Sequence, residues 1–503
     1  MRIPPGAASH LGWTRRTVPG RRSGPAGQGA GGPRRAHCFH DQQATRKSRR
    51  RPCGDGPCHS VSPEDHRPLS EPRNGRPRVA VVLPGGGARG AFEAGALSVL
   101  LPALEERGEH VSIVCGTSVG GINAALLGSV AALPAAEQAA ALLDRWRSMR
   151  RGDVIAPLIG PRAPLLALRA LGELFEVPGL RLPGLMDPRP LRDSLERWID
   201  WDALHSNVRK GVVEAVCVVA TSLDRAGPVG FVESRGALPR GSGTIRYVPV
   251  RLTGEHVRAS AAIPMLFPPV RVTTPRGAAG DYIDGGTRMN APLSPALALG
   301  ADRVIVVGFE PLERGHPPTD LRVPHFADVA ANVLDGLLVD QVAADVRRML
   351  AINSFYSEDA ATGPAPGASA YRAARGRAPY RRVVHALITP ERRGALGAIA
   401  EEVLSERYGG LRALRSPDFL LLSRLLGGGR ARARGELLSF LLFDEVFVER
   451  LIEAGREAAE RWLAAHPRLW RAHAHEVSGF SEDSERGFAE QGALAEFRSL
   501  PRR

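Results

Sequence analysis

The amino-acid sequence predicts an α/β protein built on a parallel sheet with crossover helices. Residues 78–83 and 110–116 are short apolar runs typical of buried strands, and each precedes a longer run with helical character. Strands that alternate with helices at this spacing are typical of parallel βαβ units. Further strands are expected, among them residues 211–223, 228–234 and 382–390.

Composition divides the remainder of the chain. Residues 1–77 are rich in Gly, Pro, Arg and Ser, which predicts a disordered basic extension. Residues 151–190 are apolar but punctuated by Pro and Gly, which predicts an irregular insertion. Residues 311–465 predict a mostly helical region that includes a long amphipathic helix over 328–353, and residues 466–503 predict a tail.

The net charge of +14 is unevenly distributed along the 503 residues. Residues 1–77 hold 15 of the Lys and Arg residues and five of the Asp and Glu residues, so the other 426 residues carry only +4. A basic tail is not a basic groove, and nucleic acid is therefore not an expected partner.

The cysteines and the apolar runs indicate the environment of the protein. Cys115 and Cys217 lie in apolar runs and are expected in the core, while Cys53 and Cys58 lack the C-x-x-C spacing of a zinc pair. We expect no metal and no cofactor. An odd number of cysteines without a secretory segment favours a reducing compartment, and no apolar run reaches the roughly 20 residues of a membrane span. The predicted location is cytoplasmic.

A glycine-rich stretch follows the first predicted strand. Gly85, Gly87 and Gly90 form a G-x-G-x-x-G pattern between a strand and a helix, which is also the context of a dinucleotide-binding turn. Such a turn requires an acidic residue at the end of the next strand, to bind the ribose. That strand instead ends in Cys115-Gly116-Thr117-Ser118, so the sequence disfavours a dinucleotide site.

Ser118 stands in the G-x-S-x-G pattern formed with Gly116 and Gly120, between a predicted strand and a predicted helix. Flanking glycines permit a sharp turn that exposes the serine hydroxyl at the N-terminus of the helix. This arrangement predicts a nucleophile. A nucleophile that attacks an ester also needs donors for the oxyanion, and the N–H groups of the glycine-rich stretch are candidates. Arg89 in that stretch is expected either to orient the loop or contact a substrate phosphate, or simply to bind loop carbonyls.

A serine nucleophile also needs a base, and Asp284 is the candidate. It follows an apolar run in Tyr282-Ile283-Asp284 and precedes Gly285 and Gly286, which predicts a carboxylate at the C-terminal edge of the sheet. The alternative is an aspartate that only stabilises a turn.

Taken in order, GGGARG, GTSVG and DGG resemble the motifs of the patatin-like phospholipases. The stretches at 259–270 and 284–302 are similar to further blocks of that family, and the resemblance spans residues 78–310. DGG stands where DGA is also common. Residues 328–463 resemble the helical extension of some bacterial members.

The resemblance implies a three-layer α/β/α fold and a catalytic domain over 78–310. It also implies a Ser–Asp dyad without histidine, in which Ser118 is the nucleophile and Asp284 the base. The residues implied for the oxyanion loop are Gly85, Gly86, Gly87, Arg89 and Gly90. The implied substrates are acyl esters of glycerolipids, such as phospholipids, reached by peripheral contact with a membrane surface.

Two other chemistries remain open from the sequence. An ordinary α/β-hydrolase triad would place its histidine after the acid, and His316 has the most suitable context. An acyl-enzyme resolved by an alcohol rather than by water would make the protein a transacylase.

The insertion is the candidate for contact with lipid. Residues 165–175 have the spacing of a short amphipathic helix, with Arg162 and Arg169 among apolar residues. The same residues are equally suited to packing on the core.

Overall fold

The structure is a computed structural model, and it describes residues 77–155, 184, 186, 188–239, 245–264, 266–312, 340–354, 374, 382–408 and 431–471. Residues 1–76, most of the insertion with its expected helix at 165–175, His316 and residues 472–503 lie outside the described residues. The predictions made for them remain predictions.

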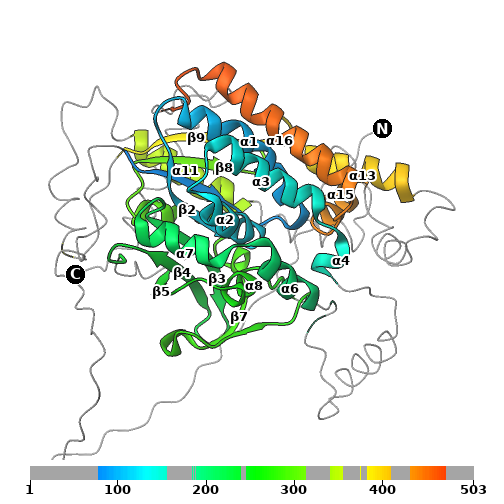
Figure 1. Ribbon diagram of the computed structural model, residues 1–503. Helices are drawn as coiled ribbons and strands as arrows, with labels where there is room; N and C mark the ends of the chain where they lie inside the picture. Colours follow the sequence, from blue (N-terminus) through cyan, green and yellow to red (C-terminus); the bar gives the residue numbers. More distant parts are fainter. Residues whose placement is uncertain are drawn as a thin grey trace, which may run out of the picture. The chain divides into compact units, whose positions relative to one another are not determined.

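One mostly parallel sheet organises the described residues (Figure 1). Its strands run in the order β5-β4-β3-β2-β1-β8-β9, and the β6–β7 pair joins it through β3. Neighbours from β3 through β9 along this path are parallel, whereas β4 and β7 are each antiparallel to β3. The bounds are β1 Val79–Leu83, β2 Val111–Thr117, β3 Ala215–Ser222, β4 Gly227–Ser234, β5 Arg246–Pro249, β6 Val270–Val272, β7 Gly280–Asp284, β8 Arg303–Val307 and β9 Val384–Ile388. The fold class and the five strands named from the sequence are confirmed.

Helices cover both faces of this sheet, because the strands carry apolar side chains on both faces. In β1, the side chains of Val79, Val81 and Leu83 join one apolar cluster, and those of Ala80 and Val82 join another. The first cluster includes α1 (Gly90–Glu105), α2 (Val119–Val130), α3 (Ala135–Ser148), α6 (Arg189–Trp198), α7 (Trp201–Lys210) and α8 (Gly254–Ser260). The second includes α9 (Leu293–Ala298) and α11 (Asp340–Ser354).

Residues beyond 311 contribute to both the sheet and the first helical layer. Strand β9 extends the sheet past β8, and α16 (Glu445–Ala465) packs along α1 (Figure 1). Two more helices are described in this region, α13 (Ala395–Tyr408) and α15 (Ala431–Ser439). The expected helical character is confirmed there, but the region also supplies a strand and core residues.

The expectation of an irregular insertion over 151–190 is wrong at its two ends. Residues Arg151–Val154 form the short helix α4, and α6 begins at Arg189. Helix α4 follows α3 closely, and Asp153 accepts a hydrogen bond from the N–H of Arg150 at 2.9 Å, which satisfies a group at the start of the helix. No described helix is long and apolar enough to span a membrane.

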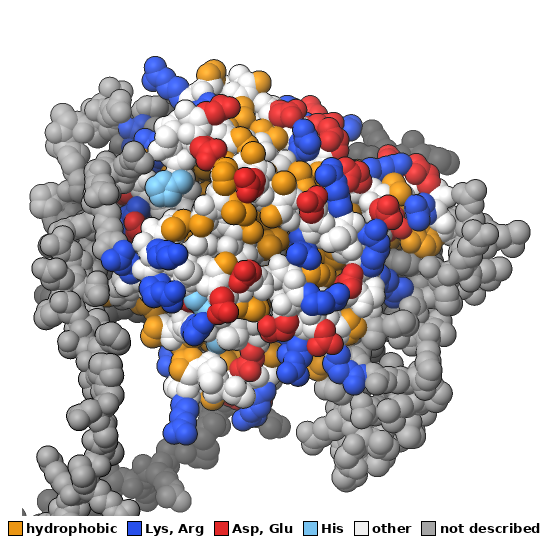
Figure 2. Space-filling view, in the orientation of Figure 1, with side chains coloured by type: hydrophobic (Ala, Val, Ile, Leu, Met, Phe, Trp, Pro, Cys, Tyr) orange, Lys and Arg blue, Asp and Glu red, His pale blue; other side chains and the backbone are white. Residues whose placement is uncertain are grey.

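Figure 2 shows basic and acidic side chains interspersed on the face that it presents. Ion pairs between elements account for part of this mixing. Arg147 of α3 pairs with Glu449 of α16 at 2.8 Å, and Arg450 of α16 pairs with Glu406 of α13 at 2.7 Å. This face therefore carries no broad patch of a single charge.

Candidate active site

Ser118 lies on the tight turn between β2 and α2. Its φ of 54° is positive, which is rare for a residue with a side chain and indicates local strain. The turn depends on both flanking glycines: a Cβ on Gly116 would lie 2.0 Å from the carbonyl oxygen of Gly120, and one on Gly120 would lie 2.1 Å from that of Leu83. The predicted nucleophile turn is therefore present in the structure.

A second serine holds this turn in place. Ser260, at the end of α8, accepts a hydrogen bond from the N–H of Ser118 at 2.8 Å and donates its own to the carbonyl oxygen of Val219 at 2.5 Å. Ser260 is fully buried. The sequence alone did not single it out, although it lies within the 259–270 stretch that resembles the family.

Asp284 lies at the end of β7, where it pairs with Ala220 of the antiparallel neighbour β3. Asp284 is 2% exposed, and its carboxylate accepts a hydrogen bond from the N–H of Gly286 at 2.7 Å. Burial raises the pKa of Asp284 to about 6, and the nearby Ser118 hydroxyl and the N–H of Gly286 act in the opposite direction. The structure thus brings the two predicted reacting groups close together.

The glycine loop, residues 85–90, lies beside Ser118. A Cβ on Gly85 would lie 2.8 Å from the Cβ of Ser118. The Asn290 side chain fixes the start of the loop, because its Oδ1 accepts from the N–H of Gly85 at 2.9 Å and its Nδ2 donates to the carbonyl oxygen of Gly85 at 3.1 Å. The sequence alone did not single out Asn290, although it lies within the 284–302 stretch that resembles the family.

The hydrogen bonds of the loop separate its members into two groups. The N–H groups of Gly85, Arg89 and Gly90 donate within the protein, to Asn290, to the carbonyl oxygen of Gly86 and to loop carbonyls respectively. Gly86 and Gly87 are not among the donors of these bonds. Of the residues implied for the oxyanion loop, these two are the best placed to donate to an oxyanion.

The Arg89 side chain points into the protein. It is fully buried, does not line the pocket beside Ser118, and pairs with the Glu436 carboxylate of α15. Its guanidinium therefore does not lie where the phosphate of a substrate in that pocket would lie. This position agrees with the expectation that Arg89 orients the loop. Its side chain, however, binds residues of α15 rather than carbonyl groups of the loop.

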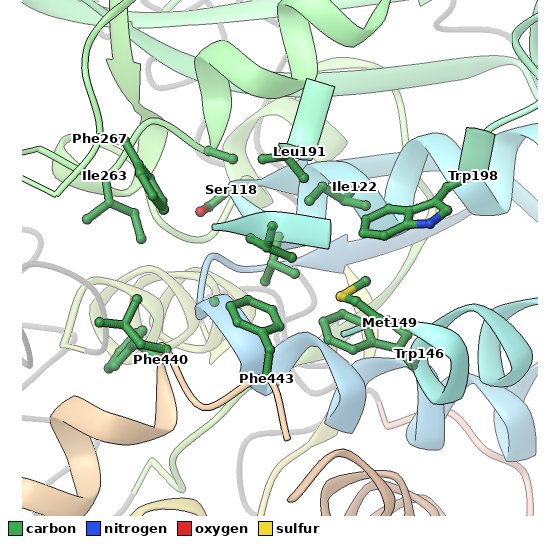
Figure 3. Close-up of a pocket in the computed structure, with 15 residues that line it drawn as sticks. Ser118, Ile122, Trp146, Met149, Leu191, Trp198, Ile263, Phe267, Phe440 and Phe443 are labelled. Carbon is green, nitrogen blue, oxygen red and sulfur yellow. The ribbon is translucent and has the colours of Figure 1, made fainter. Parts of the chain in front are cut away.

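An apolar pocket opens beside the Ser118 hydroxyl (Figure 3). It holds about 460 Å³ of empty space, a volume that includes space open to solvent. In Figure 3, Phe440 and Phe443 face Ser118 from across the pocket, and Trp198 lies beyond Ile122. Apart from Ser118 the lining is apolar or glycine: Gly87, Val119, Ile122, Trp146, Met149, Val154, Leu191, Trp198, Ala261, Ile263, Phe267, Phe440, Leu441 and Phe443.

Polar groups beneath this lining fix the position of Trp146. Its indole N–H donates to Asn123 Oδ1 at 2.9 Å, and Asn123 Nδ2 donates to Glu93 Oε2 at 2.8 Å. Complete burial raises the pKa of Glu93 well above its usual range. These hydrogen bonds hold the indole of Trp146 in the pocket wall.

Three comparisons with known proteins bear on this site. A family model described as Patatin-like phospholipase matches residues 81–297. The chain contains a patatin-like phospholipase domain. That assignment supports lipid acyl hydrolase activity. No curated protein sequence matches the chain.

Two solved structures are similar to this chain, each at 14% identity. The crystal structure of VipD from Legionella pneumophila has a TM-score of 0.27, and the alignment covers 84% of this chain and 92% of that one. Human GIVD cytosolic phospholipase A2, in complex with methyl gamma-linolenyl fluorophosphonate, has a TM-score of 0.36, with 85% of this chain and 61% of that one covered. This chain thus spans less than two thirds of the human protein's length.

The patatin-like domain contains the predicted reacting groups but not the whole lining of the pocket. Ser118, Asp284 and the glycine loop lie within 81–297, whereas Phe440, Leu441 and Phe443 lie well beyond it. No described histidine lines the pocket, and the histidine proposed from the sequence, His316, is outside the described residues.

Proposed function

We propose that the protein is a serine lipid acyl hydrolase that cleaves acyl esters of glycerolipids through a Ser118–Asp284 dyad. The observation that carries the proposal is the position of Ser118, which lines an apolar pocket and lies close to the buried carboxylate of Asp284. A nucleophile needs a base within hydrogen-bonding distance, and an acyl chain needs an apolar site.

The reaction proceeds in two steps. The Ser118 oxygen attacks the ester carbonyl carbon while its proton passes to Asp284, and the N–H groups of Gly86 and Gly87 donate to the resulting oxyanion. Collapse of this intermediate breaks the ester bond, and the leaving alcohol takes the proton from Asp284. Water then attacks the acyl-enzyme with Asp284 again as base, which releases the fatty acid and returns the proton to Ser118.

The pocket selects the acyl part of the substrate. Each buried methylene contributes about 0.8 kcal/mol, and the lining offers no polar partner apart from Ser118. The acyl chain therefore lies in the pocket and the glycerol with its head group lies toward solvent. Peripheral contact with the membrane, through the insertion at 151–190, is part of this proposal.

The test is hydrolysis by the full chain of a panel of phospholipids and neutral acylglycerols, with Ser118→Ala as the control. The proposal expects free fatty acid from at least one lipid and none above background from the variant. Release of fatty acid at equal rates by the variant would contradict it. Transfer of the acyl group to another lipid, without free fatty acid, would indicate a transacylase instead.

A further inference from the structure

The glycine loop is bound from its far side by α15. The Arg89 guanidinium donates from Nη2 to the carboxylate and to the carbonyl oxygen of Glu436, the latter at 3.1 Å, and from Nε to the Ser439 hydroxyl at 2.8 Å. The Phe440 ring lies under the same guanidinium, 4.2 Å from its central carbon. Four contacts of one buried side chain are thus made by a single short segment, residues 436–440.

The same segment also binds the backbone of the loop. The N–H of Ala88 donates to the carbonyl oxygen of Phe440 at 3.0 Å. Gly87 has a φ of +58°, and a Cβ there would lie 2.1 Å from that same oxygen. Gly87, which with Gly86 is a candidate donor to the oxyanion, therefore lies directly against the backbone of the C-terminal region.

Charge makes Glu436 the essential member of this segment. Arg89 is fully buried, so without Glu436 its positive charge would remain in the interior without its ion-pair partner. A second carboxylate, that of the partly buried Glu310, interacts electrostatically with both side chains and accepts a hydrogen bond from the N–H of Gly394 at 3.0 Å. Burial, followed by the nearby negative charge of Glu436, raises the pKa of Glu310 to about 7, and Arg89 and Arg393 lower it.

We propose that Glu436 is a positioning residue for oxyanion stabilisation, acting through Arg89 from outside the patatin-like domain. This inference rests on the proposed function. Glu436 holds Arg89, Arg89 fixes the short 3-10 helix at residues 87–89, and that helix sets the direction of the N–H groups that meet the oxyanion. A contact that only stabilised the fold would affect the amount of folded protein and leave its turnover unchanged.

The experiment compares Glu436→Gln with Glu449→Gln in the full chain, on a short soluble ester. Glu449 also pairs with an arginine of the patatin-like domain, Arg147, which is not part of the loop, so its variant loses the same charge and an arginine ion pair, in this case an exposed one. We expect Glu436→Gln to lower kcat about 10- to 100-fold with KM changed less than about 3-fold, since loss of one oxyanion donor costs about 10²- to 10³-fold. Glu449→Gln should retain the wild-type kcat.

A double-mutant cycle tests the route through Arg89. If Glu436 acts through Arg89, the Arg89→Lys, Glu436→Gln double variant should be no slower than the slower single variant. Additive losses, with each variant folded, would contradict the proposed route. If Glu436→Gln does not fold, Ser439→Ala removes the acceptor of Arg89 Nε without a change of charge, and we expect a loss of a few-fold in kcat.

The outcomes distinguish this inference from the function on which it rests. A wild-type chain without esterase activity, or an active Ser118→Ala variant, contradicts the proposed function. If the wild type is active and a folded Glu436→Gln or Ser439→Ala variant keeps the wild-type kcat, the proposed function stands. The proposed role of Glu436 is then wrong.

Discussion

The patatin-like domain at 81–297 and the C-terminal region at 382–471 contribute to one site in different ways. The domain contains the proposed reacting groups, Ser118 and Asp284, together with the glycine loop. The described part of the C-terminal region provides one wall of the pocket and contacts that hold the loop. Chemistry thus resides in short motifs, while the shape of the site depends on residues that follow no motif.

The largest expected effect is the loss of either reacting group in the patatin-like domain. Ser118→Ala and Asp284→Asn should each lower kcat for ester hydrolysis by on the order of 10³-fold or more, because the two groups act as a unit. The double variant should be scarcely slower than either single one. Circular dichroism and melting temperature provide the folding control, and a folded Asp284→Asn variant with near-wild-type kcat would remove the aspartate from the mechanism.

Gly87 is one of the points where the two regions touch at the site, and Gly87→Ala should have the next largest effect. The alanine Cβ would collide with the carbonyl oxygen of Phe440 at an unfavourable positive φ, so the loop must move. We expect kcat to fall about 10²-fold, on the scale of a lost oxyanion donor. Gly152→Ala is the matched control, since no atom lies within 4 Å of its Cβ position. Equal activity of the two variants would contradict the proposed role of the loop.

The pH dependence isolates the contribution of the patatin-like domain. Asp284 must be ionised to accept the serine proton, and burial raises its pKa to about 6. The value of kcat/KM should therefore be constant above pH 7 and fall about tenfold for each pH unit below about 6. The measurement is a pH profile on a soluble ester that does not itself titrate. A profile that stays flat down to pH 4.5 would exclude Asp284 as the base.

The pocket wall of the C-terminal region should have the smallest effect, on selectivity rather than on rate. Phe443→Leu enlarges the pocket and should shift the preferred acyl length upward, with few-fold changes in kcat/KM between neighbouring chain lengths, since each methylene contributes about 0.8 kcal/mol. Phe447→Leu is the control, because Phe447 is fully buried in α16 and does not line the pocket. It should lower the melting temperature without altering the preference. If both variants shifted the preferred acyl length equally, the shift would come from a general loss of packing and not from the pocket wall.

The sequence predicted the reacting pair because local patterns encode it. A serine between glycines after a buried strand and an aspartate before two glycines each specify a turn, and the structure joins these turns in space. The reasoning about Asp284 assumed parallel strands, whereas β7 is antiparallel to β3 and still brings its end to the same edge. The fold class followed from the alternation of strands and helices in the same way.

The support for the site could not be predicted because it comes from distant parts of the chain. Glu436 lies 347 positions from Arg89, and Asn290 lies 205 positions from Gly85. No local pattern marks a glutamate in a helix as the partner of a particular buried arginine. Hydrophobic periodicity predicts that Phe440 and Phe443 are buried but not that they line a pocket.

The most direct test of the Ser118–Asp284 dyad is covalent labelling of the full chain with a long-chain alkyl fluorophosphonate, followed by mass spectrometry of its peptides. The serine oxygen displaces fluoride from phosphorus, so the label records which hydroxyl is activated. We predict one adduct, on the peptide that contains Ser118, no such adduct in Ser118→Ala, and labelling at least about tenfold slower in folded Asp284→Asn, in line with loss of a general base. An adduct on another residue, or labelling of Asp284→Asn at the wild-type rate, would contradict the dyad.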